Sequence, residues 1–327
     1  MSLLIVMAHF DVDGVLRPHA RRTIDEYARA ADQVVVVSTS GVEESSLDRL
    51  GPNVRFITRP NFGYDFYSYK WGLDSVGEYA DFDRILITND SFVGPTVPID
   101  VILDSDACKS VDVMGMTVSK GVAPHAQSFF ITVNGFVARS TAFRRFWKDM
   151  VPLSDRMKVI LNYEIGFSAR LVESGFRMGG YFLPTEEEAQ LAKERYRHHG
   201  SVRLHSTGGQ RVVSEIAEWD ESHLSKFNPA IALADRVLVH NRLPLVKFDT
   251  LRYDPYELGA GHLLKRCEDV LPEYFGGVRR FLRETNTHYP FRRGESNLAV
   301  SPRQLRDSGL GYCHDAAFSG MDGELAK

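Results

Sequence analysis

Two carboxylates follow the first apolar run of the chain, in the stretch HFDVDGVL, where they stand as Asp11 and Asp13. Carboxylates at the end of a buried strand can act as a nucleophile or as a general acid or base towards a phosphate ester, and they can hold Mg²⁺. Ligands of α/β proteins gather beyond the carboxyl ends of the strands, so the position suits a reactive site. Taken alone, this stretch predicts phosphate-ester hydrolysis.

A second polar stretch, RPNFGYD at residues 59–65, lies where an apolar run passes into a helical segment. Gly63 lets a ligand approach the backbone closely, the first N–H groups of a helix favour an anion, and Arg59 adds a charged donor for phosphate. The alternative is an ordinary turn at Asn61 with Asp65 as the helix N-cap. For an isolated turn, the second interpretation is preferred.

A third stretch ends the apolar run RILIT with Asn89, Asp90 and Ser91. The Asp90 carboxylate can hold a divalent cation that bridges a diphosphate, and the amide and hydroxyl beside it can serve as further ligands or hydrogen-bond partners. The alternative is a turn in which Asp90 caps a helix. Because this stretch comes one helix after residues 59–65, the two interpretations carry equal weight.

Polar residues also flank apolar segments farther along the chain. His125 and Gln127 precede a strongly apolar run, where they can hydrogen-bond sugar hydroxyls or satisfy buried backbone groups. Glu164 is expected in the first turn of a helix at residues 162–175, where the helix dipole stabilises a carboxylate. It is therefore a candidate general base, and the alternative is a helix-start glutamate with an electrostatic role alone.

Short apolar runs alternate with helical segments over the first 180 or so residues, which predicts an α/β domain. The runs are continuous rather than alternating, so a mostly parallel central sheet with helices on both faces is expected. Strands are predicted at residues 3–10, 33–40, 54–58, 84–90, 111–119 and 127–138. Helices are predicted at residues 21–31, 44–50, 64–76, 98–105, 140–151 and 162–175.

The sequence changes character near its middle. Residues 1–184 are predicted to form the α/β domain, and the shorter, mixed signals at 185–294 predict a helical and mixed C-terminal extension that packs on it. Residues 295–327 have little periodicity and many Gly, Ser and Asp residues, which predicts a poorly ordered tail.

The composition of the chain limits which binding partners and which cellular compartment are expected. A formal net charge of -4 gives no electrostatic reason to expect nucleic acid. The three widely spaced cysteines predict neither a disulfide framework nor a zinc site, so a reducing cytoplasm is expected. No apolar stretch approaches the roughly 20 residues that span a bilayer, so membrane association is expected to be peripheral, at the inner face of the plasma membrane. The basic cluster of Arg195, Arg197 and Arg203 is either a solvated helix end or a contact for acidic headgroups.

Four of these stretches, taken in order, resemble the rhamnan synthesis protein F family of bacterial polysaccharide glycosyltransferases. They are R-x-N-x-G-Y-D-F at 59–66, T-N-D-S-F-V-G-P at 88–95, H-x-Q-S-F-F at 125–130 and Y-E-I-G-x-S at 163–168. With the opening AHFDVDG, the VVVVSTS run and the later LPLVKFDTLR segment, the resemblance covers about residues 1–255.

The resemblance implies a GT-A like fold that binds a nucleotide-diphosphate sugar, such as dTDP-rhamnose, and transfers the sugar with inversion to a glycan or lipid-linked glycan of a growing cell-surface polysaccharide. It implies Glu164 as catalytic base and Asp90 at the diphosphate. The implied nucleotide-sugar contacts are His9, Asp11, Thr39, Arg59, Asn61, Gly63, Asp65, Asn89 and Ser91. The implied contacts to the sugar or acceptor are His125, Gln127 and Lys247.

The resemblance also permits a looser comparison with the inverting family 2 glycosyltransferases. This chain departs from their pattern at the metal-binding carboxylates and at the catalytic base. Where that family has D-x-D, this chain has Thr88-Asn89-Asp90, so Asp90 is the only carboxylate left for Mg²⁺ or Mn²⁺. Metal dependence stays open, with Arg59 or Lys247 as cationic substitutes. Where that family has E-D, this chain has Tyr163-Glu164, which keeps a base on a longer side chain.

Two other functions remain as alternatives. The opening stretch also resembles haloacid dehalogenase phosphatases, which implies Asp11 as nucleophile and Asp13 as acid and base beside Mg²⁺. In this resemblance Ser38 to Ser40 stand at the second strand end, and Lys70 is the phosphate-neutralising lysine. Against this, position 94, where a second metal-binding carboxylate is wanted, is a glycine. A non-catalytic glycan-binding relative is the second alternative, because the D-x-D pattern is incomplete.

Overall fold

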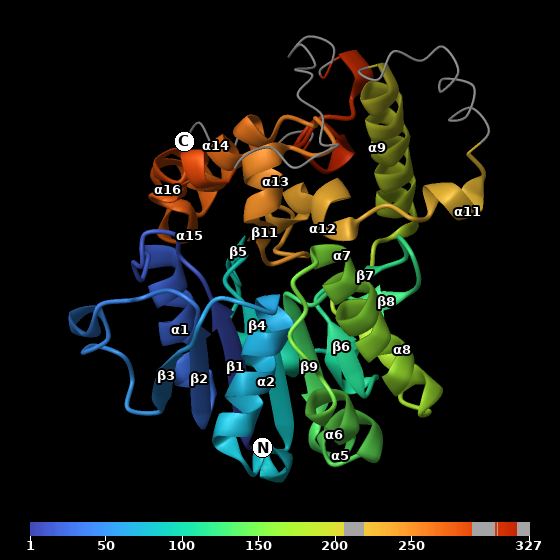
Figure 1. Cartoon of the computed structure of the whole chain (residues 1–327). Coiled ribbons are helices and arrows are strands. Elements are labelled where there is room, and N and C mark those ends of the chain that lie inside the picture. Colours follow the sequence, from blue (N-terminus) through green and yellow to red (C-terminus); the bar gives the residue numbers. More distant parts are fainter. Residues whose placement is uncertain (206–218, 290–304, 306, 319–327) are drawn as a thin grey trace. The chain divides into compact units, whose positions relative to one another are not determined.

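The computed structural model describes residues 1–205, 219–289, 305 and 307–318 of the chain (Figure 1). These residues form two compact units. The first consists of residues 1–91, 97–119 and 123–183, and the second of residues 92–96, 120–122 and the described part of 184–327. The chain leaves the first unit for the last time after Leu183. The two short segments of the second unit that come from the N-terminal half have no counterpart in the sequence-based division.

The first unit is built on a seven-stranded sheet in the order β10-β6-β9-β4-β1-β2-β3. Its strands are β1 (Leu3–His9), β2 (Gln33–Ser38), β3 (Val54–Thr58), β4 (Arg84–Asn89), β6 (Val113–Gly115), β9 (Phe130–Asn134) and β10 (Met178–Gly180). Strand β1 runs parallel to β2 and β4, whereas β9 runs antiparallel to β4 and β6. The expected α/β fold with a mostly parallel sheet is confirmed, and β9 makes the sheet mixed.

Helices cover both faces of this sheet. Alternate residues of β1, such as Leu4 and Val6, share a hydrophobic core with Phe66 and Tyr69 of α2 (Tyr64–Val76). A side chain at Gly72 of α2 would come within 2.3 Å of Val6, so glycine lets this helix lie directly on the strand. Helices α6 (Thr141–Lys148) and α8 (Gly166–Glu173) share that core, and α1 (Pro18–Ala30) contacts β1 and β2.

Several predicted boundaries differ from the structure. Residues 44–50 contain only a short 3-10 helix, Glu44–Ser46, and residues 111–119 split into β6 and β7 (Val118–Ser119), which pairs with β8 (His125–Ala126). The predicted strand at 127–138 ends early, in helix α5 (Gly135–Ala138). The reason lies at Gly135, whose N–H donates to the Asp83 carbonyl at 2.6 Å, and whose Cβ would lie 2.3 Å from the Phe82 carbonyl oxygen.

The helix that carries Glu164 begins earlier than predicted. It runs through α7 (Arg156–Val159), a π-helical turn at Ile160–Ile165 and α8, and the Asp155 side chain caps it by accepting from the Lys158 N–H. Glu164 therefore lies in the interior of the helix, and the prediction that it sits in a dipole-stabilised first turn is wrong. It lies instead in a π-helical turn, a feature that is frequent at functional sites.

The second unit is mainly helical. Its two-stranded sheet pairs β5 (Phe92–Val93) with β11 (Val246–Lys247). Its longer helices are α9 (Glu186–His205), α13 (Phe248–Tyr253), α14 (Ala260–Val270) and α16 (Val278–Glu284). Its short helices are α11 (Glu221–Leu224), α12 (Pro229–Ala232), α15 (Pro272–Phe275) and three 3-10 turns, Ala234–Val237, Asn286–His288 and Ala316–Phe318.

Arg195 is fully buried in this unit. Its guanidinium forms an ion pair with Asp235 at 2.8 Å and donates to the carbonyls of Leu310 and Gly311. Arg195 is therefore unable to join the predicted basic cluster for headgroups, and Arg203 lies outside the residues whose side chains are described. The same contacts hold part of the predicted tail, where Tyr312 is completely buried.

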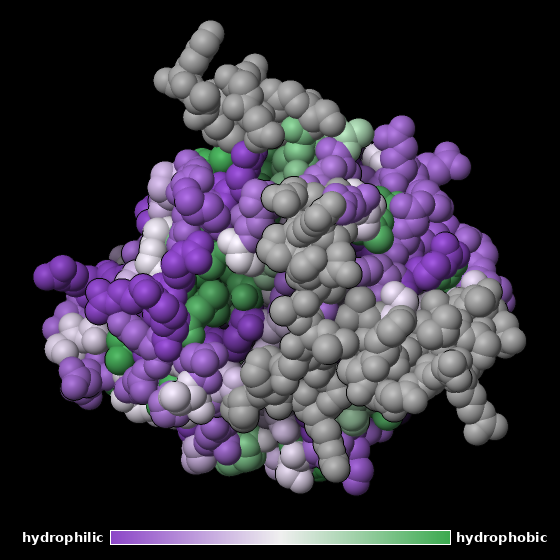
Figure 2. All heavy atoms as spheres, turned by 90° about the horizontal axis from the view of Figure 1, so that it is seen from above, coloured by the Kyte–Doolittle hydropathy of each residue, from purple (hydrophilic) through white to green (hydrophobic). Residues whose placement is uncertain are grey.

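The face drawn in Figure 2 is mainly hydrophilic, with small apolar groups between polar side chains. Within the described ranges, the structure contains no helix that is both long enough and apolar enough to cross a bilayer.

Candidate functional site

The carboxyl ends of β1, β2 and β4 bring polar residues to one edge of the sheet. The register pairs His9 with Ser38 and Ala8 with Asn89, so residues far apart in sequence end their strands side by side. The buried His9 ring hydrogen-bonds through Nδ1 to the Ser38 hydroxyl at 2.9 Å. Sequence reasoning placed His9 and Asn89 here correctly, because parallel strands share the edge at which they end.

Asp90 follows β4 at this edge and is largely buried, with 18% of its side chain exposed. Its Oδ2 accepts from the Phe10 N–H at 2.8 Å and lies 3.9 Å from His9 Nε2. Burial raises the pKa of Asp90 to about 8, and the charges of Asp65 and Asp11 act in the same direction. Burial lowers the pKa of His9 to about 4, against the attraction of Asp11. Both groups therefore favour their neutral forms at neutral pH.

These shifts predict a pH dependence of stability. Asp90 releases its proton near the ordinary aspartate pKa of 3.8 when the chain is unfolded but near 8 when it is folded, so its contribution to stability falls as pH rises through that window. His9 acts oppositely, because its folded pKa of about 4 lies below the ordinary histidine pKa of 6.5, and its contribution rises with pH between the two. Of these two groups, only Asp90 contributes a pH dependence above pH 6.5.

Asp90→Asn is therefore expected to stabilise the protein relative to wild type more at pH 8 than at pH 6.5. Melting temperatures of both proteins across this range measure the effect. The exposed Asp100→Asn in α3 (Ile99–Leu103) is the matched control and should follow wild type. Identical pH profiles for Asp90→Asn and wild type would contradict the assignment.

Asn89 joins the end of β4 to the start of α2. Its Nδ2 donates to the Asp65 carboxylate at 2.6 Å, while its Oδ1 accepts from both the N–H and the hydroxyl of Ser91. Asp65 therefore does not act as a side-chain cap of α2, since the N-cap residue Gly63 has no side chain and Asp65 bonds across to Asn89. The structure brings Asp65, Asn89 and Ser91 together, as the sequence predicted.

Glu164 joins the same cluster through two residues that sequence reasoning did not single out. Its Oε1 accepts from the Ser128 N–H at 2.7 Å and from the Ser128 hydroxyl at 3.0 Å. The buried Tyr69 hydroxyl donates to the Ser128 carbonyl at 3.0 Å. Burial raises the pKa of Tyr69 well above its usual value, and the charges of Asp65, Glu164 and Asp90 raise it further.

Both missed residues carried a signal in the sequence. Ser128 stands inside the H-x-Q-S-F-F stretch, directly after Gln127. Tyr69 follows Asp65 by four positions on a helix, which places the two on one face. Their hydroxyls looked like ordinary helix and strand content because their contacts come from segments about 36 to 59 positions away.

Arg59 has a different task from the one predicted. It is buried, and all five of its N–H groups donate within the unit: to the carbonyls of Pro60, Phe62 and Tyr64, and twice to the Ser68 hydroxyl. In this structure it has no donor left for a phosphate. Arg59 instead shapes the turn at Asn61 to Gly63, where glycine adopts a φ of 76°.

Asp11 organises the first loop rather than presenting a nucleophile. Its Oδ2 accepts from Arg17 at 2.7 Å, and its Oδ1 accepts from the N–H groups of Asp13 and Val15. Burial favours the protonated form of Asp11, but these hydrogen bonds and the Arg17 charge outweigh it and hold the pKa of Asp11 below its usual value. An aspartate engaged in this way is not presented for attack on a phosphate ester.

Two other residues of the phosphatase interpretation also have structural partners. The Thr39 N–H donates to the His9 carbonyl at 3.0 Å, at the end of β2. Lys70, on α2, donates to the Trp147 carbonyl at 2.8 Å and forms an ion pair with Asp74. The Lys70 ammonium is therefore held between α6 and Asp74.

His125 and Gln127 belong to the small sheet of β7 and β8 and the turn after it. Both are buried; His125 Nδ1 bonds the Ala123 carbonyl at 2.7 Å, and Gln127 Oε1 accepts from the Thr117 hydroxyl at 2.7 Å. The contact of His125 matches the alternative in which it satisfies a backbone group, whereas Gln127 bonds a side-chain hydroxyl. Lys247 belongs to the second unit, where it pairs with Phe92 in the sheet of β5 and β11.

Throughout the described ranges, no three His, Cys, Asp or Glu residues are grouped so as to hold an ion. Asp90 is the only carboxylate at the position of D-x-D, and its raised pKa favours the protonated form at neutral pH. Its chemistry alone does not suit Mg²⁺ or Mn²⁺, which bind deprotonated carboxylates.

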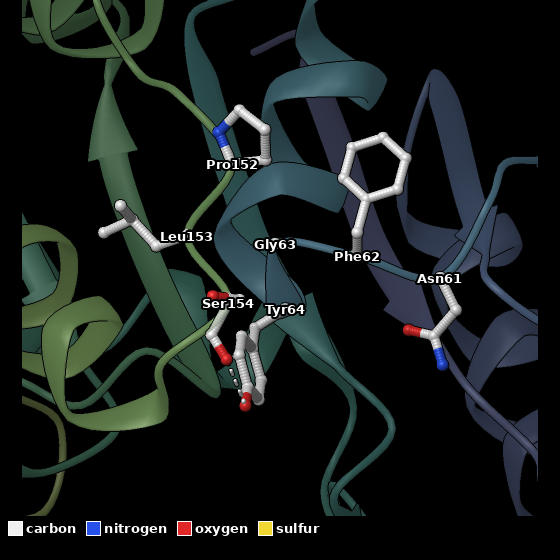
Figure 3. Close-up of a pocket in the computed structure, with 7 residues that line it drawn as sticks. All are labelled: Asn61, Phe62, Gly63, Tyr64, Pro152, Leu153 and Ser154. Carbon is white, nitrogen blue, oxygen red and sulfur yellow. Dashed lines mark hydrogen bonds between the residues drawn. The ribbon is translucent and has the colours of Figure 1, made fainter.

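A pocket of about 560 Å³ lies beside this cluster (Figure 3). It is lined by Asn61, Phe62, Gly63, Tyr64, Pro152, Leu153 and Ser154. The turn before α2 forms one wall and the loop between α6 and α7 forms the other, and the Tyr64 hydroxyl joins them by donating to the Ser154 carbonyl at 3.3 Å.

Comparison with known proteins agrees with the order of the motifs. The model of the rhamnan synthesis protein F family matches residues 34–206, more than half of the chain. The virulence protein VirA of Vibrio anguillarum is 34% identical over 221 residues, 66% of this chain and 67% of that protein. An uncharacterized protein, y4gN, of Sinorhizobium fredii is 27% identical over 159 residues, 47% of this chain and 42% of that protein. The chain belongs to the rhamnan synthesis protein F family.

Proposed function

We propose that this protein is a glycosyltransferase of polysaccharide synthesis that moves a deoxyhexose, with rhamnose as the first candidate, from a nucleotide-diphosphate donor to a growing glycan. The observation that carries the proposal is the placement of Glu164. A carboxylate with one oxygen fixed by Ser128 stands in a cluster at the carboxyl edge of a mostly parallel sheet, in a member of a rhamnan synthesis family. A GT-A like fold is part of the proposal.

The chemistry follows from the two oxygens of Glu164. Within the described part of the chain, both hydrogen bonds to this carboxylate fall on Oε1, which leaves Oε2 to take a proton. The acceptor hydroxyl gives its proton to Oε2 while its oxygen forms a bond to the anomeric carbon. The bond from that carbon to the diphosphate breaks, and the nucleoside diphosphate leaves with inversion at the sugar.

The donor is proposed to lie along the edge of the sheet, near His9, Thr39, Asp65 and Asn89. Arg59 and Arg17 are engaged within the first unit, so the proposal assigns the diphosphate charge to neither of them but to a cation bound with the donor. No step is derived through a metal ion. The three free cysteines fit the proposed cytoplasmic location, where thiols stay reduced.

Nucleotide binding is the direct test. At a concentration of about 100 Kd, a ligand stabilises the native state by about 2.7 kcal/mol, which corresponds to roughly 5–10 °C in melting temperature for a domain of this size. We expect dTDP-rhamnose and dTDP to raise the melting temperature, and free rhamnose and dTMP to do so far less. Parallel series with Mg²⁺, Mn²⁺ or EDTA measure the metal dependence.

If a panel of nucleoside diphosphates and their sugars leaves the melting temperature unchanged in all three series, the protein does not use such a donor. Binding without release of nucleoside diphosphate in the presence of glycan acceptors would instead support a non-catalytic relative.

A further inference from the structure

We infer that the pocket of Figure 3 binds a neutral sugar ring of the acceptor glycan, not the donor nucleotide. This inference rests on the proposed function. It moves Asn61 and Gly63 from the donor contacts that the resemblance implies to the acceptor side.

The lining of the pocket selects a neutral ligand. None of its seven residues carries a charge, and the Arg59 guanidinium, which lies over the Phe62 ring, donates to carbonyls of the turn itself. A diphosphate needs charged or cationic partners that this lining lacks. A volume of about 560 Å³ lies within the range of small-molecule sites, which combine apolar and aromatic walls with a few polar groups.

The two aromatic rings of the pocket are exposed but held in place. Phe62 is 42% exposed and Tyr64 is 43% exposed. Arg59 lies over the Phe62 ring at 5.4 Å and Tyr67 packs against it at 5.3 Å, while the Tyr64 hydroxyl is bonded to Ser154. Rigid rings with an open face suit the apolar C–H face of a pyranose, and more so a deoxyhexose with its methyl group.

The walls of the pocket connect it to the carboxylates of the proposed reaction. Tyr64 directly precedes Asp65, which bonds Asn89. On the other wall, Val151 exchanges two hydrogen bonds with the Tyr163 hydroxyl, at 3.2 Å for its N–H and 2.5 Å for its carbonyl. Tyr163 directly precedes Glu164, so the loop that lines the pocket is fixed to the helical turn of the proposed base. The acceptor hydroxyl must approach that base, whereas the nucleotide need not.

Saturation-transfer NMR with methyl α-L-rhamnopyranoside at millimolar concentration tests the inference on the full chain. We expect transfer from the protein to the sugar, and about tenfold weaker binding in Phe62→Ala, because truncating a central aromatic anchor typically costs that much or more. Phe62→Trp keeps a ring and should retain binding. The matched control is Phe136→Ala, which removes a ring that is 49% exposed in α5, at the start of β4 and so at the opposite edge of the sheet.

Thermal stabilisation by dTDP, measured on the same variants, separates this inference from the proposed function. If Phe62→Ala binds the sugar as wild type does, or if wild type does not bind it, the pocket is not a sugar site, although dTDP binding still supports the transferase. Loss of dTDP stabilisation in a folded Phe62→Ala that still binds the sugar would assign the pocket to the donor and overturn the inference.

Discussion

Glu164→Gln is expected to lower glycosyl transfer by about 10²- to 10⁴-fold, the range that a positioned general base contributes. The substitution is nearly isosteric. A glutamine Oε1 can still accept from the Ser128 N–H and hydroxyl, so the side chain should keep its place. The nitrogen that replaces Oε2 cannot take the acceptor proton. Release of dTDP from dTDP-rhamnose, with a glycan acceptor or slowly with water, measures the loss.

Two measurements make this result specific. Stabilisation by dTDP should be unchanged in Glu164→Gln, because the amide removes a base and leaves the donor contacts intact. Glu173→Gln, an exposed change at the end of the same helix, should behave as wild type in both assays. Wild-type transfer by a folded Glu164→Gln would show that another group is the base.

The first unit could be predicted well where its strands are continuous apolar runs. Strand β2, for example, is formed by QVVVVS, a continuous apolar run of the kind that is typical of a strand buried on both faces of a sheet. Boundaries failed where tertiary contacts decide them. The strand predicted at 127–138 gives way to α5 because Gly135 packs against the carbonyls of Phe82 and Asp83. The local sequence pattern contains no signal for a contact with residues so far away in the chain.

The candidate site was predictable in part, for a similar reason. Residues that end parallel strands must share an edge, so His9, Asn89 and Asp90 could be placed together. The roles of Arg59 and Asp11 could not be predicted. The local sequence does not distinguish an arginine that donates to carbonyls of its own turn from one that binds phosphate, nor an aspartate that accepts from its own loop from a nucleophile. The hydrogen bonds that link Tyr69 to Ser128 and Ser128 to Glu164 join three segments that are distant in the sequence, so only the folded chain reveals them.

Arg59→Met is expected to destabilise the first unit by about 3 kcal/mol, because it leaves the buried Ser68 hydroxyl and three partly buried carbonyl groups without donors, and an unsatisfied buried group costs about 1–3 kcal/mol. The groups concerned are the carbonyls of Pro60, Phe62 and Tyr64 and the hydroxyl of Ser68. Methionine fills a similar volume and retains the apolar stem, so the loss reports the hydrogen bonds. The melting temperature should fall by roughly 6–12 °C.

Arg55→Met separates this scaffold role from a general effect of removing an arginine. Arg55 is exposed on β3, the strand that Arg59 directly follows, and donates to the Ser75 carbonyl at 2.9 Å, so its loss should change stability by no more than about 0.5 kcal/mol. If Arg59→Met instead melts as wild type does and loses only dTDP stabilisation, Arg59 binds phosphate, as the sequence implied. The expected pattern is the reverse: the turn loosens first, the Phe62 ring loses the guanidinium beneath it, and ligand binding weakens because the walls of its pocket are no longer fixed.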